Sequence, residues 1–521
     1  MNLAMPARPA PPTGFEAQTL AVLDALHRLG PRPLRSVPRD DLRREPTLAD
    51  AVRLVLWEEG SDLSPEPVGA AEAVVIQGPG ASQGPGTTEG AGRPGALTLG
   101  LTWPLGYEDG LLPVIVFVHG GWVRSGVDAA EASIRALANR TGCIVVAVDY
   151  RQPPAHPFPA AHDDVLAAVA WTRSAIGEFG GDRDRLALAA EGHGAGMAVT
   201  ACLARPEPST PPPRFLLLVD PVVDHEGRGW PSASEHAGSP ALDLEAFEEV
   251  TELAFADPLD RRDVRASPLQ AATSALAGMP PTLVVTAASD LARDQGEAFG
   301  RRLIEAGVDA TVMRADGVGH GYLATNPVVE RAQEVVSIAA RFLRGALDLP
   351  GEAAPARPPD LAQVVMADHR AIRLLLRSLE TGRPAEKGLV LAQLTEVLGA
   401  HEQLERELLY PEVATLAGAE AVEESLAEHR DLAEALELLA GTTPGGPAGS
   451  EAGDMLGLVI ASAHEHMAEE EAELLPRLLA SLGPERMRDL GRRALAWRQA
   501  EATRRGPRPT YAPGAREPAH P

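Results

Sequence analysis

The pattern of hydrophobic and polar positions divides the chain into two parts. In the first part, short runs rich in β-branched residues alternate with stretches of helical period, which is typical of a mostly parallel sheet with crossover helices. These runs cover residues 114–118, 144–148, 186–189, 215–219 and 282–285. The second part shows only long stretches of helical period, at residues 361–380, 388–409, 421–440 and 454–480. Four helices of similar length joined by short loops predict an all-α, up-and-down four-helix bundle.

Three low-complexity stretches indicate where the domains begin and end. Residues 77–95 are rich in Gly, Pro, Ser and Thr and lie between two strand-like runs, so we expect a long hairpin loop there. A Pro/Ala-rich stretch after residue 350 is typical of a linker. We therefore predict a multidomain protein with these parts: an α/β domain over residues 1–347, a linker over 348–359, the helical bundle over 360–502 and a disordered tail over 503–521.

Length and charge limit the classes of function. The chain has 521 residues, which is too long for one ordinary core and favours two or more domains. Its formal net charge is -26, and without a basic stripe to neutralise phosphates we expect no binding to nucleic acid or to anionic membranes. No stretch of about 18 apolar residues and no signal-like N-terminus appears. Both cysteines lie in apolar or helical patterns, so we expect buried thiols and a reducing, cytoplasmic location.

One short motif occurs twice in the predicted bundle. The pattern His-x-x-x-Glu, with a proline ten residues after the histidine, starts at His401 and again at His466. A spacing of four residues places His401 and Glu405 on one helix face, and it does the same for His466 and Glu470. We expect the proline to close each helical segment.

The other two predicted helices each contribute one histidine directly after an acidic residue, His369 and His429. In an antiparallel bundle these histidines meet the repeated His/Glu pairs in the interior. Imidazole and carboxylate together suit iron, and bridging carboxylates let two metal ions share their charge about 3.5–4 Å apart. A single helix histidine is more often an ordinary satisfied or exposed residue, but the repeat and the two further histidines together favour a di-iron centre. His464, on another face of its helix, is expected to be solvated.

This arrangement resembles the hemerythrin/HHE cation-binding family over nearly all of residues 360–480. The resemblance implies a ligand set in which the two glutamates bridge two irons. That set is His369, His401, Glu405, His429, His466 and Glu470. On the third helix, Ser425 and Ala433 stand one turn from His429, where oxygen-carrying hemerythrins have a second histidine. One iron then keeps an open position for O2 or a related small ligand, which favours iron binding or oxygen and redox sensing over reversible oxygen carriage.

Five segments of the α/β domain carry a second resemblance. They read Val-His-Gly-Gly-Trp at 118–122, Asp-Tyr-Arg at 149–151, His-Pro-Phe-Pro-Ala at 156–160, Asp-Leu-Ala-Arg-Asp at 290–294 and Asp-Gly-Val-Gly-His-Gly at 316–321. As a set they resemble the hormone-sensitive-lipase-like esterase family of α/β-hydrolases, over most of residues 15–345. Such enzymes need a serine on a sharp turn, a histidine, an acid and backbone N–H groups that bind the oxyanion.

The resemblance assigns roles to several residues. It implies that Asp290 is the acid and His320 the base of a catalytic triad. The oxyanion loop would consist of His119, Gly120 and Gly121. This loop lacks the third glycine of the family, because Trp122 follows directly. The N-terminal helical region and the insertion at 225–265 would form a lid over a pocket for a small ligand or an ester.

Agreement with this family ends at the nucleophile. The family's Gly-Asp-Ser-Ala-Gly-Gly turn falls on residues 190–195, which read Ala-Glu-Gly-His-Gly-Ala, so Gly192 stands at the position of the serine. Shifting the register by two residues places Gly194 there, and neither register supplies a hydroxyl or a thiol. His193 has two interpretations: it acts as a nucleophile or as a base for water, or it only fills the vacated pocket. Ser125 would not lie on the strained turn that exposes a nucleophile.

These patterns favour an iron-dependent sensor or regulatory protein, in which a di-iron bundle reports oxygen, redox state or iron supply. The α/β-hydrolase domain, degenerate at the nucleophile, would bind a small ligand or a partner. Two alternatives stay open. One is a carboxylic-ester hydrolase that works through a non-standard group near His193 and His320, and the other is an iron storage or detoxification protein. The sequence leaves the ligand, the oligomeric state and the coupling between the domains open.

Overall fold

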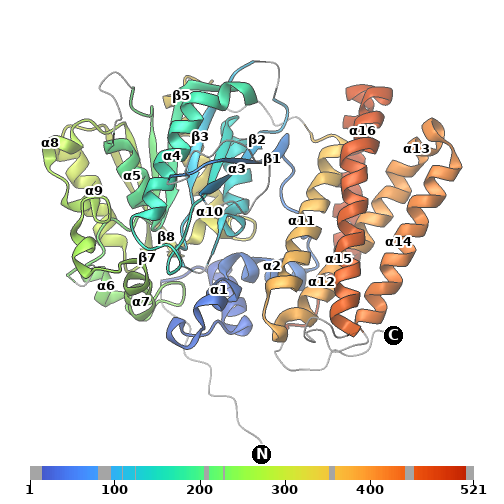
Figure 1. The fold of residues 1–521 in the computed structure, drawn as a ribbon, viewed down its shortest axis with the longest axis horizontal. Coiled ribbons are helices and arrows are strands. Elements are labelled where there is room, and N and C mark those ends of the chain that lie inside the picture. Colours follow the sequence, from blue (N-terminus) through green and yellow to red (C-terminus); the bar gives the residue numbers. More distant parts are fainter. Residues whose placement is uncertain are drawn as a thin grey trace, which may run out of the picture.

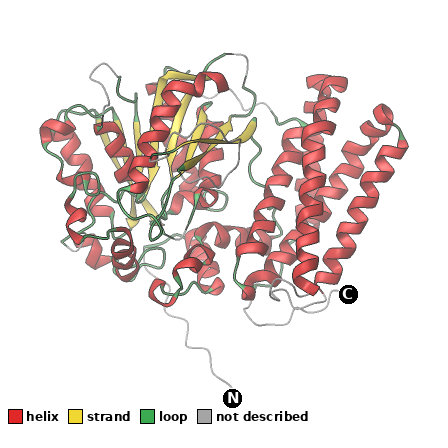
Figure 2. Cartoon of the chain, viewed as in Figure 1, coloured by secondary structure: helices red, strands yellow, loops and turns green. Residues whose placement is uncertain are grey.

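The computed structural model places an α/β domain beside a bundle of long helices (Figure 1, Figure 2). It describes residues 14–79, 95–107, 110–123, 125–204, 211–226, 229–350, 358–440 and 451–511. The predicted fold class, a mostly parallel sheet with flanking helices followed by a helical bundle, is confirmed. Of the predicted linker, residues 351–357 lie outside the described residues.

The α/β domain is built on an eight-stranded sheet with the order β1-β2-β4-β3-β5-β6-β7-β8. Strands β3 to β8 run parallel to one another, whereas β2 pairs antiparallel with both β1 and β4. The strand bounds are β1 Ala70–Gln77, β2 Ala96–Trp103, β3 Leu112–Val118, β4 Ile144–Asp149, β5 Gly181–Glu191, β6 Leu216–Val219, β7 Thr282–Ser289 and β8 Ala310–Gly319. The predicted hairpin loop between β1 and β2 falls largely on residues 80–94, which lie outside the described residues.

Alternate residues of each strand face two separate hydrophobic layers, because side chains point to opposite faces of a sheet in turn. In β3, for example, Val114 and Val116 belong to one layer, and Ile115 and Phe117 to the other. The first layer is covered by α4 (Ala160–Ala175), α5 (Gly194–Leu203) and α9 (Arg293–Glu305). The second is covered by α1 (Ala17–Leu29), α2 (Leu48–Glu59), α3 (Glu131–Thr141) and α10 (Glu330–Ala346). Burial on both faces fixes the register of the strands.

The bundle consists of long helices whose apolar faces pack on one another. Their bounds are α11 Leu361–Thr381, α12 Lys387–Leu404, α13 Tyr410–Ala417, α14 Ala419–Ala440, α15 Glu451–Glu469 and α16 Leu475–Arg505. A π-helical turn joins α12 to α13, and another joins α15 to α16, so each of these pairs forms one continuous rod. After a kink at Gly483, where φ is +73°, α16 runs along α11.

The prediction that a proline closes each repeated segment is wrong. Pro411 and Pro476 lie in the first turn of α13 and α16, directly after the π-helical turns Glu405–Leu409 and Glu470–Leu474. Proline lacks the amide hydrogen that would bond to the carbonyl four residues back, and its ring crowds that carbonyl. The preceding turn therefore widens while the helix continues. Both widened turns begin at the glutamate of the repeated motif.

The two domains are in direct contact along α11, α12 and the end of the chain. Leu389 of α12 is buried in the same hydrophobic layer as α1 and α2. Arg383, after α11, donates hydrogen bonds to the carbonyl oxygens of Leu29 and Gly30 at 2.5 and 2.9 Å. Apolar burial and charged hydrogen bonds therefore hold the bundle against the N-terminal helices of the α/β domain.

The chain from residue 503 to residue 511 is ordered, contrary to the prediction of a disordered tail. Helix α16 runs to Arg505, and the following residues lie along α2. The backbone N–H of Tyr511 donates to Glu58 at 2.6 Å, and Arg508 lies over the ring of Trp57. These contacts with the α/β domain give the segment partners that its Pro/Arg-rich composition did not indicate. Residues 512–521 lie outside the described residues.

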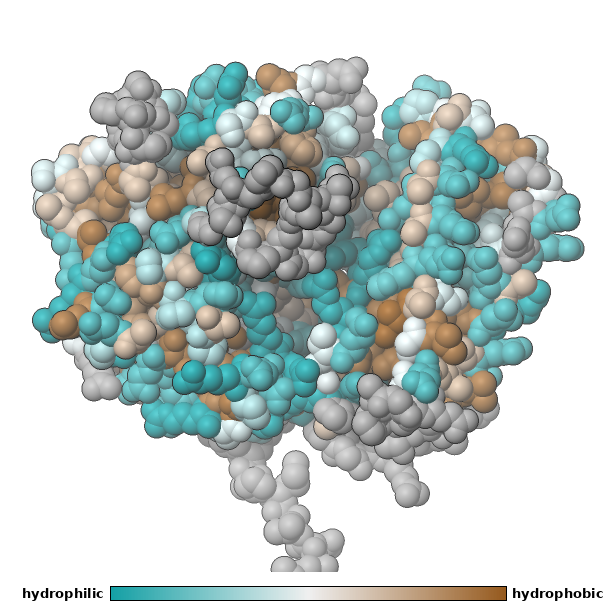
Figure 3. Space-filling model, viewed as in Figure 1, coloured by the Kyte–Doolittle hydropathy of each residue, from teal (hydrophilic) through white to brown (hydrophobic). Residues whose placement is uncertain are grey.

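Hydrophilic side chains cover much of the visible face of both domains and are interrupted by smaller apolar patches (Figure 3). Among the described helices, none combines the length and the apolar character needed to cross a lipid bilayer. Cys143 and Cys202 are buried thiols, as predicted.

Candidate functional site

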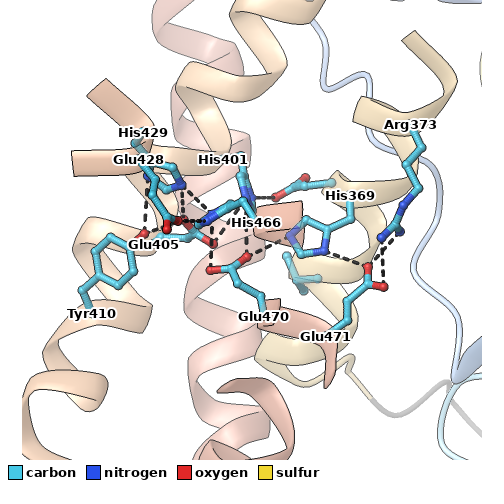
Figure 4. A network of polar contacts seen from close by, with 12 residues as sticks. His369, Arg373, His401, Glu405, Tyr410, Glu428, His429, His466, Glu470 and Glu471 are labelled. Atoms are coloured by element: carbon cyan, nitrogen blue, oxygen red, sulfur yellow. Dashed lines mark hydrogen bonds and ion pairs between the residues drawn. The ribbon is translucent and has the colours of Figure 1, made fainter. Parts of the chain in front are cut away.

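Six side chains from the four rods of the bundle converge in its interior (Figure 4). They are His369 from α11, His401 from α12, Glu405 from the following π-helical turn, His429 from α14, His466 from α15 and Glu470 from the second π-helical turn. These are the six residues expected to hold metal. All are buried except His466, which exposes 10% of its side chain.

The donor atoms of these side chains form two overlapping groups. In each group the donor atoms all lie within 4.8 Å of one another; the groups are His369, His401, Glu405 and Glu470, and Glu405, His429 and His466. Glu405 belongs to both. Glu470 also connects them, because its two oxygens lie 3.0 Å from Nε2 of His369 and 3.7 Å from Nε2 of His466. The arrangement offers two cation positions that share carboxylates.

The other ring nitrogen of each histidine has a polar partner of its own. These pairs are His369 Nδ1 with Glu471 at 2.8 Å, His401 Nδ1 with Asp368 at 3.5 Å, His466 Nδ1 with Glu428 at 2.9 Å and His429 Nδ1 with the Tyr410 hydroxyl at 3.4 Å. Hydrogen-bonded partners fix the orientation of a ring and direct its Nε2 to a metal, whereas Asp368 faces Nδ1 of His401 at an ion-pair distance without a hydrogen bond. Asp368 and Glu428 directly precede His369 and His429 in the sequence, but each contacts a histidine of another helix.

The residues present fit a pair of cations. Both ring nitrogens of His401 and one oxygen each of Glu405 and Glu470 are buried without a hydrogen-bond partner, and desolvated carboxylates are costly unless a cation or a proton compensates them. Burial and the charge of Glu470 raise the pKa of Glu405 well above its usual value. Burial also raises the pKa of Glu470, but the hydrogen bond from His369 and the nearby histidines outweigh it and lower that pKa to about 2. Nitrogen and oxygen donors of this kind suit iron. His464 is exposed, as predicted.

The α/β domain carries a second group of candidate residues at the carboxyl ends of β5, β7 and β8. Gly192 lies in the turn between β5 and α5 with a φ of +49°. A Cβ built on Gly192 would lie 3.1 Å from Nε2 of His320. A Cβ on Gly194 would instead clash with the carbonyl oxygens of Val118 and His119, at 2.5 and 2.6 Å. The position that faces the histidine is therefore Gly192, as in the ungapped register.

Asp290 and His320 form the expected pair. Oδ2 of Asp290 lies 2.9 Å from Nδ1 of His320, and Oδ1 accepts a hydrogen bond from the backbone N–H of Ala292, also at 2.9 Å. Burial lowers the pKa of His320, but the charge and the hydrogen bond of Asp290 outweigh it and raise that pKa to about 9. The contact with Asp290 therefore favours the protonated form of the His320 imidazole.

Asp220 belongs to the same group and was not identified from the sequence. It directly follows β6 with a φ of +47°. Its carboxylate accepts hydrogen bonds from the backbone N–H groups of Ala287 and Gly321, both at 2.9 Å. It thereby holds the residue that follows His320. The sequence does contain a signal for Asp220, because an acidic residue directly after a buried parallel strand lies where such sheets place their functional sites.

Both parts of the chain match known families. Residues 115–324 match the family described as alpha/beta hydrolase fold, and residues 360–478 match the hemerythrin HHE cation binding domain. Carboxylesterase NlhH of Mycobacterium tuberculosis is 37% identical over 250 residues, which cover 47% of this chain and 77% of the relative. The chain belongs to the α/β-hydrolase fold family. Its second domain is a hemerythrin HHE cation-binding domain.

Further similar proteins are also named as hydrolases or esterases. Ethyl acetate hydrolase of Pseudomonas putida is 31% identical over 222 residues, which cover 42% of this chain and 69% of the relative. The solved structure of a thermostable esterase from Pseudomonas putida ECU1011 is 31% identical, with a TM-score of 0.55, and the match covers 66% of this chain and 100% of the esterase.

His193 of the hydrolase domain lies in a cluster of aromatic rings. Its ring centroid is 5.0 Å from that of Trp122, 5.6 Å from that of His225 and 6.1 Å from that of Phe247. Burial and the charges of His225 and His320 lower the pKa of His193 well below its usual value, and its buried Nε2 has no hydrogen-bond partner. These surroundings favour the second interpretation, in which His193 fills the pocket beside Gly192.

The predicted oxyanion loop of the hydrolase domain lies against the Gly192 turn. A Cβ on Gly120 would be 3.3 Å from the carbonyl oxygen of Glu191, so the two turns touch. His119 stacks on Tyr150 with ring centroids 4.4 Å apart, and the Tyr150 hydroxyl donates to the His119 carbonyl oxygen at 2.9 Å. Gly121 has a φ of +80°. The hydroxyl of Ser125 occupies the place that a Cβ on Gly121 would take.

The two expected lid segments of the hydrolase domain touch each other. Arg35, after α1, forms an ion pair with Glu249 at 2.7 Å. Glu249 belongs to α7 (Leu244–Ala254), within the insertion at 225–265. Phe247 of the same helix brings its ring into the cluster around His193. The insertion therefore packs aromatic side chains against His193 and Trp122, beside the Gly192 turn.

Proposed function

We propose that the HHE domain binds two iron ions and reports oxygen, redox state or iron supply, and that the hydrolase domain binds a small ligand without hydrolysing it. The observation that carries the metal assignment is the pair of donor groups that share Glu405. The residues that would hold the ions are His369 and His401 at one position, His429 and His466 at the other, and Glu405 and Glu470 between them. Bound iron supplies reversible redox chemistry and a site for O2.

The donor count supports sensing over a closed structural site. Each ion would have two histidines of its own and two shared carboxylates, which is fewer donors than the six positions of an octahedral iron. Open positions admit a small ligand such as O2. The polar partners on the Nδ1 atoms keep the rings in place whether or not such a ligand is bound.

Iron analysis together with an optical spectrum tests this proposal. Protein produced with ample iron should contain close to two irons per chain, and its spectrum should change reversibly on reduction and reoxidation. Absence of stoichiometric iron contradicts the proposal. An iron content far above two per chain would favour storage or detoxification instead.

The proposal that the hydrolase domain does not hydrolyse esters has its support in Gly192. No hydroxyl or thiol stands at the position that faces His320, and loss of a triad nucleophile lowers turnover by about 10⁶. His193, beside it, lies among aromatic rings, and burial lowers its pKa, which makes it a weaker base. A small acid, ester or lactone would bind beside His320 and the oxyanion loop, as in the related esterases.

A second candidate, an active carboxylic-ester hydrolase, is favoured by the intact pair of Asp290 and His320. A water molecule beside His320 would then replace the serine as the attacking group. A chromogenic short-chain ester assay on the natural protein and on His320→Ala separates the two. If both proteins hydrolyse the ester no faster than buffer does, the result supports a domain that binds a ligand without hydrolysing it. If the natural protein is faster and His320→Ala lowers its rate, the result supports an active hydrolase.

A further inference from the structure

Asp368 joins the metal centre to the hydrolase domain. Its side chain is buried on α11, one residue before His369, and Oδ2 lies 3.5 Å from Nδ1 of His401. Oδ1 accepts a hydrogen bond from the hydroxyl of Ser64 at 2.6 Å. Ser64 belongs to the hydrolase domain, in the segment between α2 and β1. A group of one domain therefore holds the carboxylate that faces Nδ1 of a metal-facing histidine of the other.

Arg498 of α16 completes the surroundings of this carboxylate. It donates to Oδ1 of Asp368 and pairs with Asp62 of the hydrolase domain at 3.4 Å. A cavity of about 20 Å³ lies among Asp62, Ser64, Asp368 and Arg498, which is room for about one water molecule. Asp368 and Arg498 expose only 5% and 9% of their side chains, so the charge-assisted hydrogen bond between them is strong. The HHE domain alone would leave Asp368 with Arg498 but without Ser64.

The residue on the other side of His369 also binds the hydrolase domain. Arg370 pairs with Glu131 at 2.5 Å and with Asp128 at 2.9 Å. These two acids lie shortly after the oxyanion loop, at the start of α3. Both neighbours of His369 are thus anchored in the hydrolase domain, so the position of α11 against that domain and the orientation of the metal-facing histidines are linked.

We propose that Asp368 is a positioning residue for the metal centre, that Ser64 of the hydrolase domain holds it in place, and that docking of the hydrolase domain thereby tightens metal binding by the HHE domain. This inference depends on the proposed function of the centre as a metal site. Because coupling between two equilibria is reciprocal, metal binding strengthens the docked arrangement by the same factor. The hydrolase domain therefore influences the iron concentration at which the metal centre becomes occupied.

The test measures the metal affinity of the full-length protein by competition for ferrous iron with a chromogenic chelator. Ser64→Ala removes one hydrogen bond to Asp368 and should weaken binding about 3- to 10-fold. Ser64→Thr keeps the hydroxyl and should restore most of the affinity. Asp368→Asn removes the charge beside His401 and should weaken binding by about 10- to 100-fold. Both weakened variants should also shift the optical spectrum of the loaded centre.

Ser378→Ala is the matched control, because its hydroxyl lies on the same helix but donates to the carbonyl oxygen of Leu374 at 2.9 Å. It should leave affinity and spectrum unchanged. If Ser64→Ala and Asp368→Asn bind iron as the natural protein does, this inference is overturned while the proposed function stands. If the natural protein binds no metal, the proposed function fails and the inference fails with it. If Asp368→Asn does not fold, the iron affinities of Ser64→Ala and Ser64→Thr still test the inference.

Discussion

A Cβ on Gly192 would lie 3.1 Å from Nε2 of His320. The turn, the histidine and its partner Asp290 thus lie together at the carboxyl ends of the strands, and a glycine stands at the position that faces the histidine. The metal centre differs in this respect, because its six side chains already face one another with their ring partners in place. The hydrolase domain therefore has a glycine where its histidine faces the turn, whereas the HHE domain brings together the six side chains expected from its sequence.

Gly192→Ser should create ester hydrolysis. A restored nucleophile is worth about 10⁶ in turnover, and an incomplete oxyanion hole costs about 10³, so we expect a gain of about 10³-fold over the natural protein. A chromogenic short-chain ester measures it. Gly192→Ala is the control, because it carries the same backbone strain at a φ of +49° without a hydroxyl. A Gly192→Ser protein that folds but reacts no faster than Gly192→Ala would show that the pocket, and not the nucleophile, blocks catalysis.

His466→Ala should lower the iron content, whereas His464→Ala should not. The first variant removes a donor from the group that contains Glu405 and His429, and the second removes an exposed histidine two residues away on the same helix. With one ion's donors reduced, we expect roughly one iron per chain to be lost. Elemental analysis of both purified variants gives the result. Equal loss from both variants would place metal binding elsewhere on the helix.

Removal of the metal should destabilise the bundle. A ligand present at about 100 times its dissociation constant stabilises a protein by about 2.7 kcal/mol, which corresponds to about 5–10 °C in the midpoint of a domain of this size. Without a cation, the buried carboxylates of Glu405 and Glu470 also repel each other. Calorimetry before and after chelation, followed by addition of iron, measures the shift. An unchanged transition would contradict tight binding to the folded state.

The pair of His320 and Asp290 should contribute stability that alkaline pH removes. The pKa of His320 rises from 6.5 to about 9 on folding, so the folded state holds this proton more tightly. Its contribution to the free energy of unfolding is complete below pH 6.5, declines between pH 6.5 and 9 and is lost above pH 9. The free energy of unfolding should fall by roughly 3 kcal/mol across this range. Urea unfolding at both ends of this window, for the natural protein and for His320→Gln, isolates the contribution. A difference between the two proteins that stays constant with pH would refute it.

Short-range spacing was enough to predict the class of both domains and the metal-facing residues. A histidine and a glutamate four residues apart share a helix face whatever surrounds them, so His401 with Glu405 and His466 with Glu470 could be paired from the sequence. The strand pattern likewise predicted the central strands β3 to β7, which are buried on both faces. The edge strand β8, half exposed, was not among the predicted runs.

Other features depend on neighbours that are distant in the chain. Each proline of the repeat was predicted to end a helix, but the packed rods keep the helix and the turn before the proline widens instead. Residues 503–511 read as a disordered tail because nothing in their composition indicates the acidic surface of α2, where Glu58 binds them. The environment of His193 came from Trp122, His225 and Phe247, which lie on three separate segments.

The sequence by itself determined which side chains can act, because helical and strand periods assign residues to faces without knowledge of the rest of the fold. Only the tertiary structure decided which carboxylate contacts which histidine. Asp368 lies next to His401 and Glu428 next to His466, although each of these acids directly precedes a different histidine in the chain. It also decided that Ser64 of the hydrolase domain reaches the metal centre. These pairings follow from how helices and domains pack on one another, and packing depends on contacts between residues far apart in sequence.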